Sequence, residues 1–194
     1  MTPRTATRQR ATKETDIDVR LDLDGSGRAE VSTGLPFFDH MLEQLGRHGG
    51  FDLTLSAKGD LDVDAHHTVE DTGIVLGAAL AEALGDKAGV RRFASGLYPL
   101  DEALVQVALD LSGRAYLVYE VETSPERIGT FDPQLAEEFW RAFVTSAGIT
   151  LHLKALSGRN GHHVLEACFK GVARSLRDAV RIDGDGVPST KGTL

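Results

Sequence analysis

The chain has 194 residues, of which 41% are hydrophobic and 26% are charged. This composition is typical of a globular protein, and the length suffices for one larger domain or two small packed halves. The formal net charge of -8 argues against a general nucleic-acid-binding protein, which needs a basic face. No apolar run approaches the ~20 residues of a membrane span, so we expect no membrane partner. A single cysteine excludes an internal disulfide framework, and a cytoplasmic location is expected.

The N-terminal residues 1–10 are rich in Arg and Thr and lack the apolar core of a signal peptide. We therefore expect a frayed basic arm. After it, Ile17, Val19, Leu21 and Leu23 alternate with polar residues, which indicates a half-buried strand. The segment DLDGSGRAEV then predicts a strand, a glycine turn and a second strand, which together would form a hairpin.

The next elements of the first half are a helix, a strand and a second helix. Pro36 should open the first helix, which Gly49 and Gly50 should stop. A short strand is expected over residues 51–57. A Gly-containing loop follows, and the long second helix begins at the sequence HHTVEDTGIVLGAALAEAL.

The same order recurs in the second half of the chain. DLSGRAYLV predicts a second hairpin, and Pro133 should open a helix that ends at Gly148. A strand is then expected over residues 149–155, followed by a helix over HHVLEACFKGVARSLRDAV. GVRRFASGLYPLDEA predicts a strand and turn that bridge the halves. We infer an α+β protein with an internal duplication, residues 11–90 and 91–182, forming one functional domain. Composition alone favours a disordered tail over residues 183–194.

A motif of two adjacent histidines followed by a glutamate is the strongest chemical signal. It occurs in two copies 96 residues apart: His66, His67 and Glu70, then His162, His163 and Glu166. On a helix, residues i and i+4 share a face and i+3 lies beside it, so each copy directs its side chains nearly one way. Imidazole and carboxylate together suit a first-row divalent metal ion. The alternative is a polar helix N-terminus capped by Asp64, but the repetition favours metal binding.

Two further histidines have suggestive settings. His40 should lie on the polar face of the first helix, and strand alternation directs His152 away from Leu151 and Leu153. Alone, each would be taken as structural, as we take His48. Beside the two motifs we expect both to be ligands, which gives six histidines and two glutamates for two metal ions. The donor types by themselves suggest zinc or iron.

Candidate anion-binding residues form a second group. They are cations and hydroxyls near the motifs, the bridging strand, the second glycine turn and the tail: Arg92, Arg114, Lys170, Ser189, Thr190 and Lys191. Hydroxyls, loop amides and cationic side chains suit a phosphate group.

Taken together, the motifs resemble the imidazoleglycerol-phosphate dehydratase family from about Arg10 to Leu194. The matching segments are TKETDIDV, LPFFDHML, DAHHTVEDTGI, RFASGLYPLDEA, DLSGRAYL, EFWRAF, TLHLKALSGRNGHHVLEACFKGVARSL and PSTKG. The resemblance implies two similar halves whose helices are sandwiched between two four-stranded mixed β-sheets. It also implies a homo-oligomer of 24 subunits with active sites shared between subunits.

The resemblance implies two Mn²⁺ ions per active site in place of zinc. The matching ligands are His40, His66, His67, Glu70, His152, His162, His163 and Glu166. The matching phosphate contacts are Arg92, Arg114, Lys170, Ser189 and Lys191. They make residues 183–194 a phosphate-contacting tail. Glu14 matches a residue at the reacting diol, and Gln44 lies in a segment that contacts substrate.

The reaction implied by the resemblance is elimination of water from D-erythro-imidazoleglycerol phosphate to give imidazoleacetol phosphate. The proton that is lost lies on a carbinol carbon without an adjacent carbonyl. An imidazolate bridging two Mn²⁺ ions can expel the neighbouring hydroxyl and make that C–H acidic. A carboxylate then removes the proton. Glu14 is the first candidate, and a metal-bound water or a ligand glutamate, Glu70 or Glu166, is the second.

Two other classes remain as alternatives on the motifs alone. A dinuclear hydrolase would use the metals to activate water and would depend little on an imidazole in the substrate. A metal-storage or metal-sensing protein would explain the histidine motifs, but it gives no reason for the anion-binding group.

Overall fold

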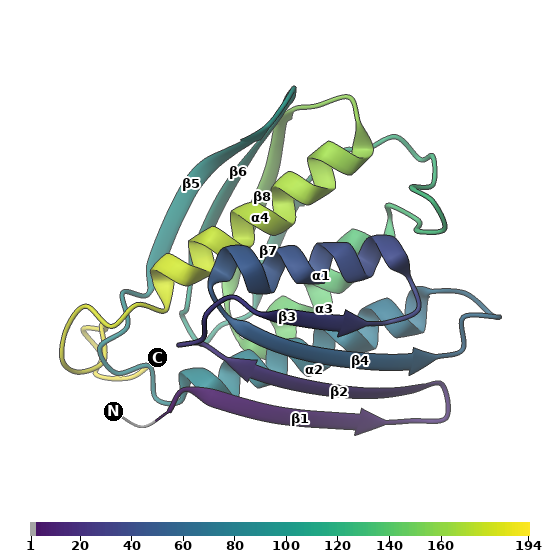
Figure 1. Ribbon diagram of the computed structural model, residues 1–194. Coiled ribbons are helices and arrows are strands. Elements are labelled where there is room, and N and C mark those ends of the chain that lie inside the picture. Colours follow the sequence, from purple (N-terminus) through teal and green to yellow (C-terminus); the bar gives the residue numbers. More distant parts are fainter. Residues whose placement is uncertain (1–2) are drawn as a thin grey trace.

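Two four-stranded mixed sheets enclose the helices in the computed structural model, which describes residues 3–194 (Figure 1). The first half contains β1 (Thr5–Ala11), β2 (Thr15–Asp22), β3 (Ala29–Ser32), α1 (Pro36–Gly49), β4 (Asp52–Gly59) and α2 (His66–Leu84). The second half contains β5 (Phe93–Leu100), β6 (Ala103–Asp110), β7 (Tyr116–Glu120), α3 (Leu135–Ala147), β8 (Thr150–Ser157) and α4 (Gly161–Ala179). The repeated order confirms the predicted α+β fold with two similar halves.

The two predicted hairpins, β2 with β3 and β6 with β7, are wrong. The strand orders are β1-β2-β4-β3 and β5-β6-β8-β7, so a later strand lies between each expected pair. The glycine turn is bound to that later strand, because Asp52 Oδ1 of β4 accepts from the backbone N–H groups of Ser26 at 2.7 Å and Arg28 at 3.0 Å. β3 then pairs parallel to β4 at the sheet edge. Neighbouring segments therefore belong to one sheet without contacting as a hairpin.

The frayed arm expected at residues 1–10 is also wrong for the described part of the chain; Met1 and Thr2 lie outside the described residues. β1 pairs antiparallel with β2 along its whole length, from Thr5 opposite Asp22 to Ala11 opposite Asp16. Arg10 on this edge strand forms an ion pair with Asp71 of α2. The arginines that suggested a solvated arm thus lie on the helix side of the sheet.

The core lies where the inner faces of the sheets meet the helices. Alternate residues of β2 and β4 are buried, and the same alternation holds in β6 and β8, where Leu151 and Leu153 are fully buried. The second helix of each half packs on its own sheet and on the first helix of the other half, α2 on α3 and α4 on α1. Within residues 3–194, no helix is both long and apolar enough to cross a bilayer.

The predicted helix boundaries are largely confirmed. α1 begins at Pro36 and ends before Gly50, and α3 ends before Gly148; both glycines adopt the left-handed conformation of a helix C-cap. α2 and α4 begin at His66 and Gly161. Each copy of the histidine motif therefore lies in the first turns of a long helix, as the sequence predicted.

Candidate active site

One set of predicted ligands comes together between α1 and α4. One nitrogen of His40, one of His162 and one carboxylate oxygen of Glu166 all lie within 4.8 Å of one another, and no other such set occurs within residues 3–194. His162 Nε2 lies 2.9 Å from Glu166 Oε2, and His40 Nε2 lies 3.7 Å from the same oxygen. All three side chains are half-buried. Two imidazoles and a carboxylate at this spacing can hold a divalent cation.

Polar groups surround this cluster on both helices. Gln44 lies 3.3 Å from His40 and its Oε1 lies 2.9 Å from His48 Nε2, so the predicted substrate-contacting glutamine is beside a ligand. Lys170 Nζ lies 2.6 Å from Glu166 Oε1. Burial works to raise the pKa of Glu166, but the Lys170 and His162 contacts outweigh it and lower that pKa. The carboxylate is therefore held in its anionic, metal-binding form.

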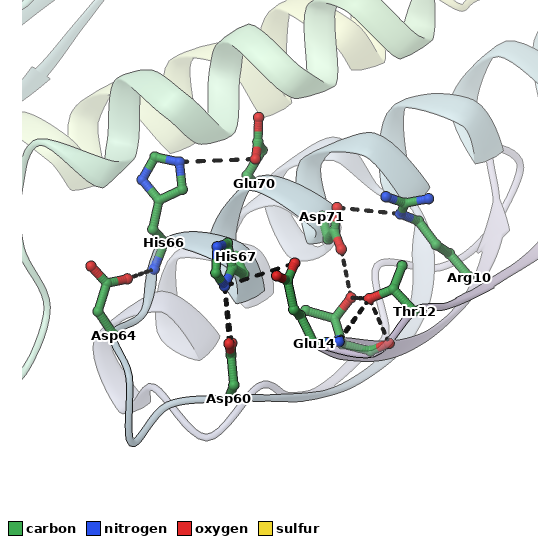
Figure 2. A network of polar contacts seen from close by, with 10 residues as sticks. Arg10, Thr12, Glu14, Asp60, Asp64, His66, His67, Glu70 and Asp71 are labelled. Atoms are coloured by element: carbon green, nitrogen blue, oxygen red, sulfur yellow. Dashed lines mark hydrogen bonds and ion pairs between the residues drawn. The ribbon is translucent and has the colours of Figure 1, made fainter.

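The motif on α2 forms a second group (Figure 2). His66 Nε2 lies 3.9 Å from Glu70 Oε2. His67 Nδ1 lies 3.0 Å from Asp60 Oδ2 and 4.0 Å from Glu14 Oε2. The hydrogen bond that Asp60 accepts from His67 is the largest influence that raises the pKa of His67. Glu14, expected at the reacting diol, is thus beside the motif, with its side chain 56% exposed.

The turn that carries Glu14 is anchored on α2. Thr12 Oγ1 accepts from the backbone N–H groups of Glu14 and Thr15, both at 3.0 Å. Thr15 in turn donates its hydroxyl to the buried Asp71 at 2.5 Å. Asp71 also accepts from Arg10 at 3.2 Å (Figure 2). The position of Glu14 is therefore tied to the helix that bears His67 and Glu70.

His163 is not part of the set formed by His40, His162 and Glu166, although its ring centroid lies 6.1 Å from that of His162, and it contacts a different carboxylate. Its Nδ1 is 2.8 Å from Glu102 Oε2, in the turn between β5 and β6. The His163 hydrogen bond, together with the backbone N–H groups of Asn160 and Arg159, lowers the pKa of Glu102 to about 2. The same hydrogen bond raises the pKa of His163.

His152 is isolated from the other predicted ligands. It lies on β8 between the buried Leu151 and Leu153, opposite Ala108 and Val118 in the sheet. Because alternation buries the leucines against the helices, His152 is exposed on the outer face, as predicted. One chain thus does not bring all eight predicted ligands into one set.

The predicted anion-binding residues divide into two places. An open pocket of about 640 Å³ brings together Arg92, Arg114, Pro188, Ser189, Thr190, Lys191, Thr193 and Leu194. Arg92 is fixed there by two hydrogen bonds to Asp110, at 2.6 and 3.0 Å, and by one to the carbonyl of Pro188 at 2.8 Å. Lys170 does not line this pocket, because α4 carries it beside Glu166. The tail is thus bound to Arg92, contrary to a disordered end.

Sequence reasoning missed Asp60, Asp71 and Glu102. Asp60 follows a strand in a loop, Asp71 was one polar residue in an apolar helix, and Glu102 lies in a turn. The only available signal was the duplication, which places Glu102 in the turn that matches the turn of Glu14.

Comparisons with known proteins agree along almost the whole chain. The family model for imidazoleglycerol-phosphate dehydratase matches residues 33–176. A protein of that name from Acidothermus cellulolyticus is 61% identical over 193 residues, which cover 99% of this chain and 94% of that protein. Another, from Gluconacetobacter diazotrophicus, is 56% identical over 196 residues and covers 100% of this chain and 99% of that protein.

Two solved structures share the fold. The imidazoleglycerol-phosphate dehydratase of Staphylococcus aureus superimposes with a TM-score of 0.83 at 37% identity, covering 92% of this chain and 99% of that one. The enzyme of Pyrococcus furiosus, solved in complex with (S)-C348, gives a TM-score of 0.84 at 39% identity, covering 96% and 99%. The three-layer arrangement and the duplication are thus common to these proteins.

Proposed function

The chain belongs to the imidazoleglycerol-phosphate dehydratase family of hydro-lyases, and from this premise we propose how its residues carry out the reaction. The proposed substrate is D-erythro-imidazoleglycerol phosphate, which loses water to give imidazoleacetol phosphate, a step of histidine biosynthesis. The observation that carries the proposal is the joining of His40, His162 and Glu166 in one cluster, with family membership over the whole chain. A hydrolase or a storage protein has no such support.

Two Mn²⁺ ions per site are part of this proposal. The donor set fits, because neutral imidazoles with carboxylates suit first-row divalent ions and Glu166 is held as an anion. His40, His162 and Glu166 would hold one ion, and His66, His67, Glu70, His152 and His163 would complete the sites. Bound manganese would supply Lewis acidity toward the substrate's imidazole.

The anion pocket would bind the substrate's phosphate. Arg114 and Lys191 are exposed at the pocket, Ser189 of the tail is half-buried there, and Arg92 is already oriented by Asp110. Cationic side chains, hydroxyls and loop N–H groups together suit a phosphate dianion. Binding at this remote group would orient the diol for reaction. Lys170 would act at the metal cluster, beside Glu166.

Glu14 would move the proton in this scheme. Its carboxylate is exposed, lies 4.0 Å from His67 and is carried by a turn fixed to α2. A general base must reach the proton it removes, and an exposed carboxylate on an anchored turn can do so. Glu70 and Glu166 are the alternative groups, although both contact neighbouring ligand or cationic side chains.

The proposal also includes a homo-oligomer of 24 subunits in which each active site is shared between subunits. The support is the separation of ligands in one chain: His152 is exposed on the outer face of one sheet, while His40 lies between α1 and α4. A second copy would supply the missing donors. A cytoplasmic location stays a prediction from the sequence.

The direct test is turnover by the purified protein. With Mn²⁺ and imidazoleglycerol phosphate, we expect a ketone product without release of inorganic phosphate. Ketone formation can be followed spectroscopically and phosphate by a colorimetric assay. Phosphate release without a ketone would instead identify a hydrolase, and neither product in a metal-loaded sample would contradict the proposed function.

Replacing Arg114 by alanine should weaken the binding of substrate and leave Mn²⁺ binding unchanged. A charge-assisted hydrogen bond contributes about 1.5–3 kcal/mol, which predicts roughly a ten- to hundredfold rise in substrate Kd. Calorimetry with imidazoleglycerol phosphate measures the change. Arg127→Ala, in an exposed loop outside the pocket, is the matched control. Equal substrate affinity in Arg114→Ala and the control would exclude the phosphate contact.

A further inference from the structure

The second histidine of each motif has a carboxylate from outside the motif on the same ring nitrogen. His67 Nδ1 lies 3.0 Å from Asp60, and His163 Nδ1 lies 2.8 Å from Glu102. Asp60 comes from the loop after β4, whereas Glu102 comes from the turn between β5 and β6. Both halves thus place a carboxylate at the Nδ1 atom of the second histidine, but the carboxylate comes from a different segment in each half.

Both carboxylates are held in position by their surroundings. Glu102 Oε1 accepts from the backbone N–H groups of Arg159 at 3.2 Å and Asn160 at 2.9 Å, which leaves Oε2 for His163. Asp60 directly follows Gly59, which packs so closely on Thr68 of α2 that a Cβ would overlap the threonine hydroxyl. The end of β4 therefore lies against the helix turn that carries His67.

The duplication shows which turns of the two halves correspond. The turn between β1 and β2 carries Glu14, and the matching turn between β5 and β6 carries Glu102. In the second half, the turn carboxylate itself contacts the histidine. In the first half, Asp60 occupies that place, and Glu14 remains 4.0 Å away, beyond hydrogen-bond distance.

We propose that Asp60 and Glu102 are positioning residues that hold His67 and His163 with Nδ1 as the hydrogen-bond donor and Nε2 free for a metal ion. Asp60 thereby leaves Glu14 available for chemistry. The inference rests on the proposed metal-dependent function. Carboxylates that accept from the second nitrogen of a ligating histidine fix its tautomer and orientation, and their loss commonly lowers metal affinity 10- to 100-fold.

The test compares Asp60→Ala with Asp62→Ala, a control in the same loop whose side chain is exposed. Competition of the purified proteins with a chelator gives the Mn²⁺ affinity. Asp60→Ala should bind Mn²⁺ roughly 10- to 100-fold more weakly, and Asp62→Ala should match the wild type. Asp60→Asn keeps an oxygen acceptor and should recover part of the loss. Affinity within about threefold of the wild type in Asp60→Ala would overturn the inference.

A second readout needs no metal. Histidine-selective ¹⁵N labelling and long-range ¹H–¹⁵N spectra at pH 8 report the tautomer of each ring in the metal-free protein. His67 and His163 should carry the proton on Nδ1, and Asp60→Ala should lose this preference at His67 alone. For the second half the variant is Glu102→Gln, because Glu102 also accepts hydrogen bonds from the backbone of residues 159–160. Circular dichroism should show that this variant retains the fold. An Nε2–H tautomer at both histidines of the wild type would overturn the inference.

These readouts separate the inference from the function on which it rests. If the wild type binds Mn²⁺ but produces no ketone, the proposed function fails, and the affinities and tautomers still decide the roles of Asp60 and Glu102. If the wild type is an active dehydratase and Asp60→Ala shows the wild-type affinity and tautomer, the inference alone fails.

Discussion

Glu14→Gln is expected to lower kcat by about 10²–10⁴-fold, the usual contribution of a general acid–base group. Glutamine keeps the size of the side chain but removes the base. The turn should retain its position, because its anchors are Thr12 and the Thr15–Asp71 hydrogen bond, which do not involve the Glu14 carboxylate. Steady-state kinetics with imidazoleglycerol phosphate measures the effect.

The control for this variant is Glu30→Gln, an exposed glutamate on the edge strand β3. It should leave kcat unchanged, and both variants should have normal Mn²⁺ content and oligomer size. A kcat within about threefold of the wild type in fully loaded Glu14→Gln corresponds to only ~0.6 kcal/mol of barrier and would contradict the role. The proton transfer would then pass to Glu70, Glu166 or a bound water.

Removing the metal should abolish turnover and yield smaller oligomers. Metal ions acting as Lewis acids contribute several kcal/mol of transition-state stabilisation, so turnover should fall by about 10³-fold or more. Some predicted ligands, such as His152 and His162, lie apart in one chain and would share a metal ion only when they come from different subunits. Assembly should therefore weaken when the ion that links the subunits is removed. Activity and light scattering, before and after EDTA, measure the two effects.

Two additions sharpen this experiment. EDTA already saturated with Mn²⁺ is the matched control and should change neither activity nor mass. Adding Mn²⁺ back should restore both. An unchanged molecular mass after verified removal of the metal would show that assembly is independent of it, and undiminished turnover in that sample would contradict the metal-dependent mechanism.

The sequence predicted the elements better than their pairing. Strand alternation identified the buried side of β8 and the exposure of His152, and Pro36 and Gly50 marked the ends of α1. These signals are local. The insertion of β4 between β2 and β3 is a non-local pairing, which short-range patterns do not specify. The arginine-rich β1 was misjudged because its partners, Glu82 and Asp71, lie far along the chain.

The candidate site was predictable as a set of residues but not as a geometry. The two motifs stood out by repetition, yet the meeting of His40 with His162 depends on the packing of α1 against α4. By contrast, Lys170 lies beside Glu166 through the i,i+4 spacing on α4, and it does not line the anion pocket. Asp60 and Glu102 carry no motif, because a carboxylate that orients a histidine needs only proximity in space.

The two helix contacts between the matching halves differ in how closely the helices approach. Exact twofold symmetry between the two halves would make both contacts identical. In this chain, α2 meets α3 through Gly73, where a Cβ would lie 2.6 Å from the carbonyl oxygen of Phe139. The matching residue of α4 is the bulky Phe169. The contact between α1 and α4 is instead the place where His40 meets His162 and Glu166 of the second motif copy, so the two contacts between the matching halves are not equivalent.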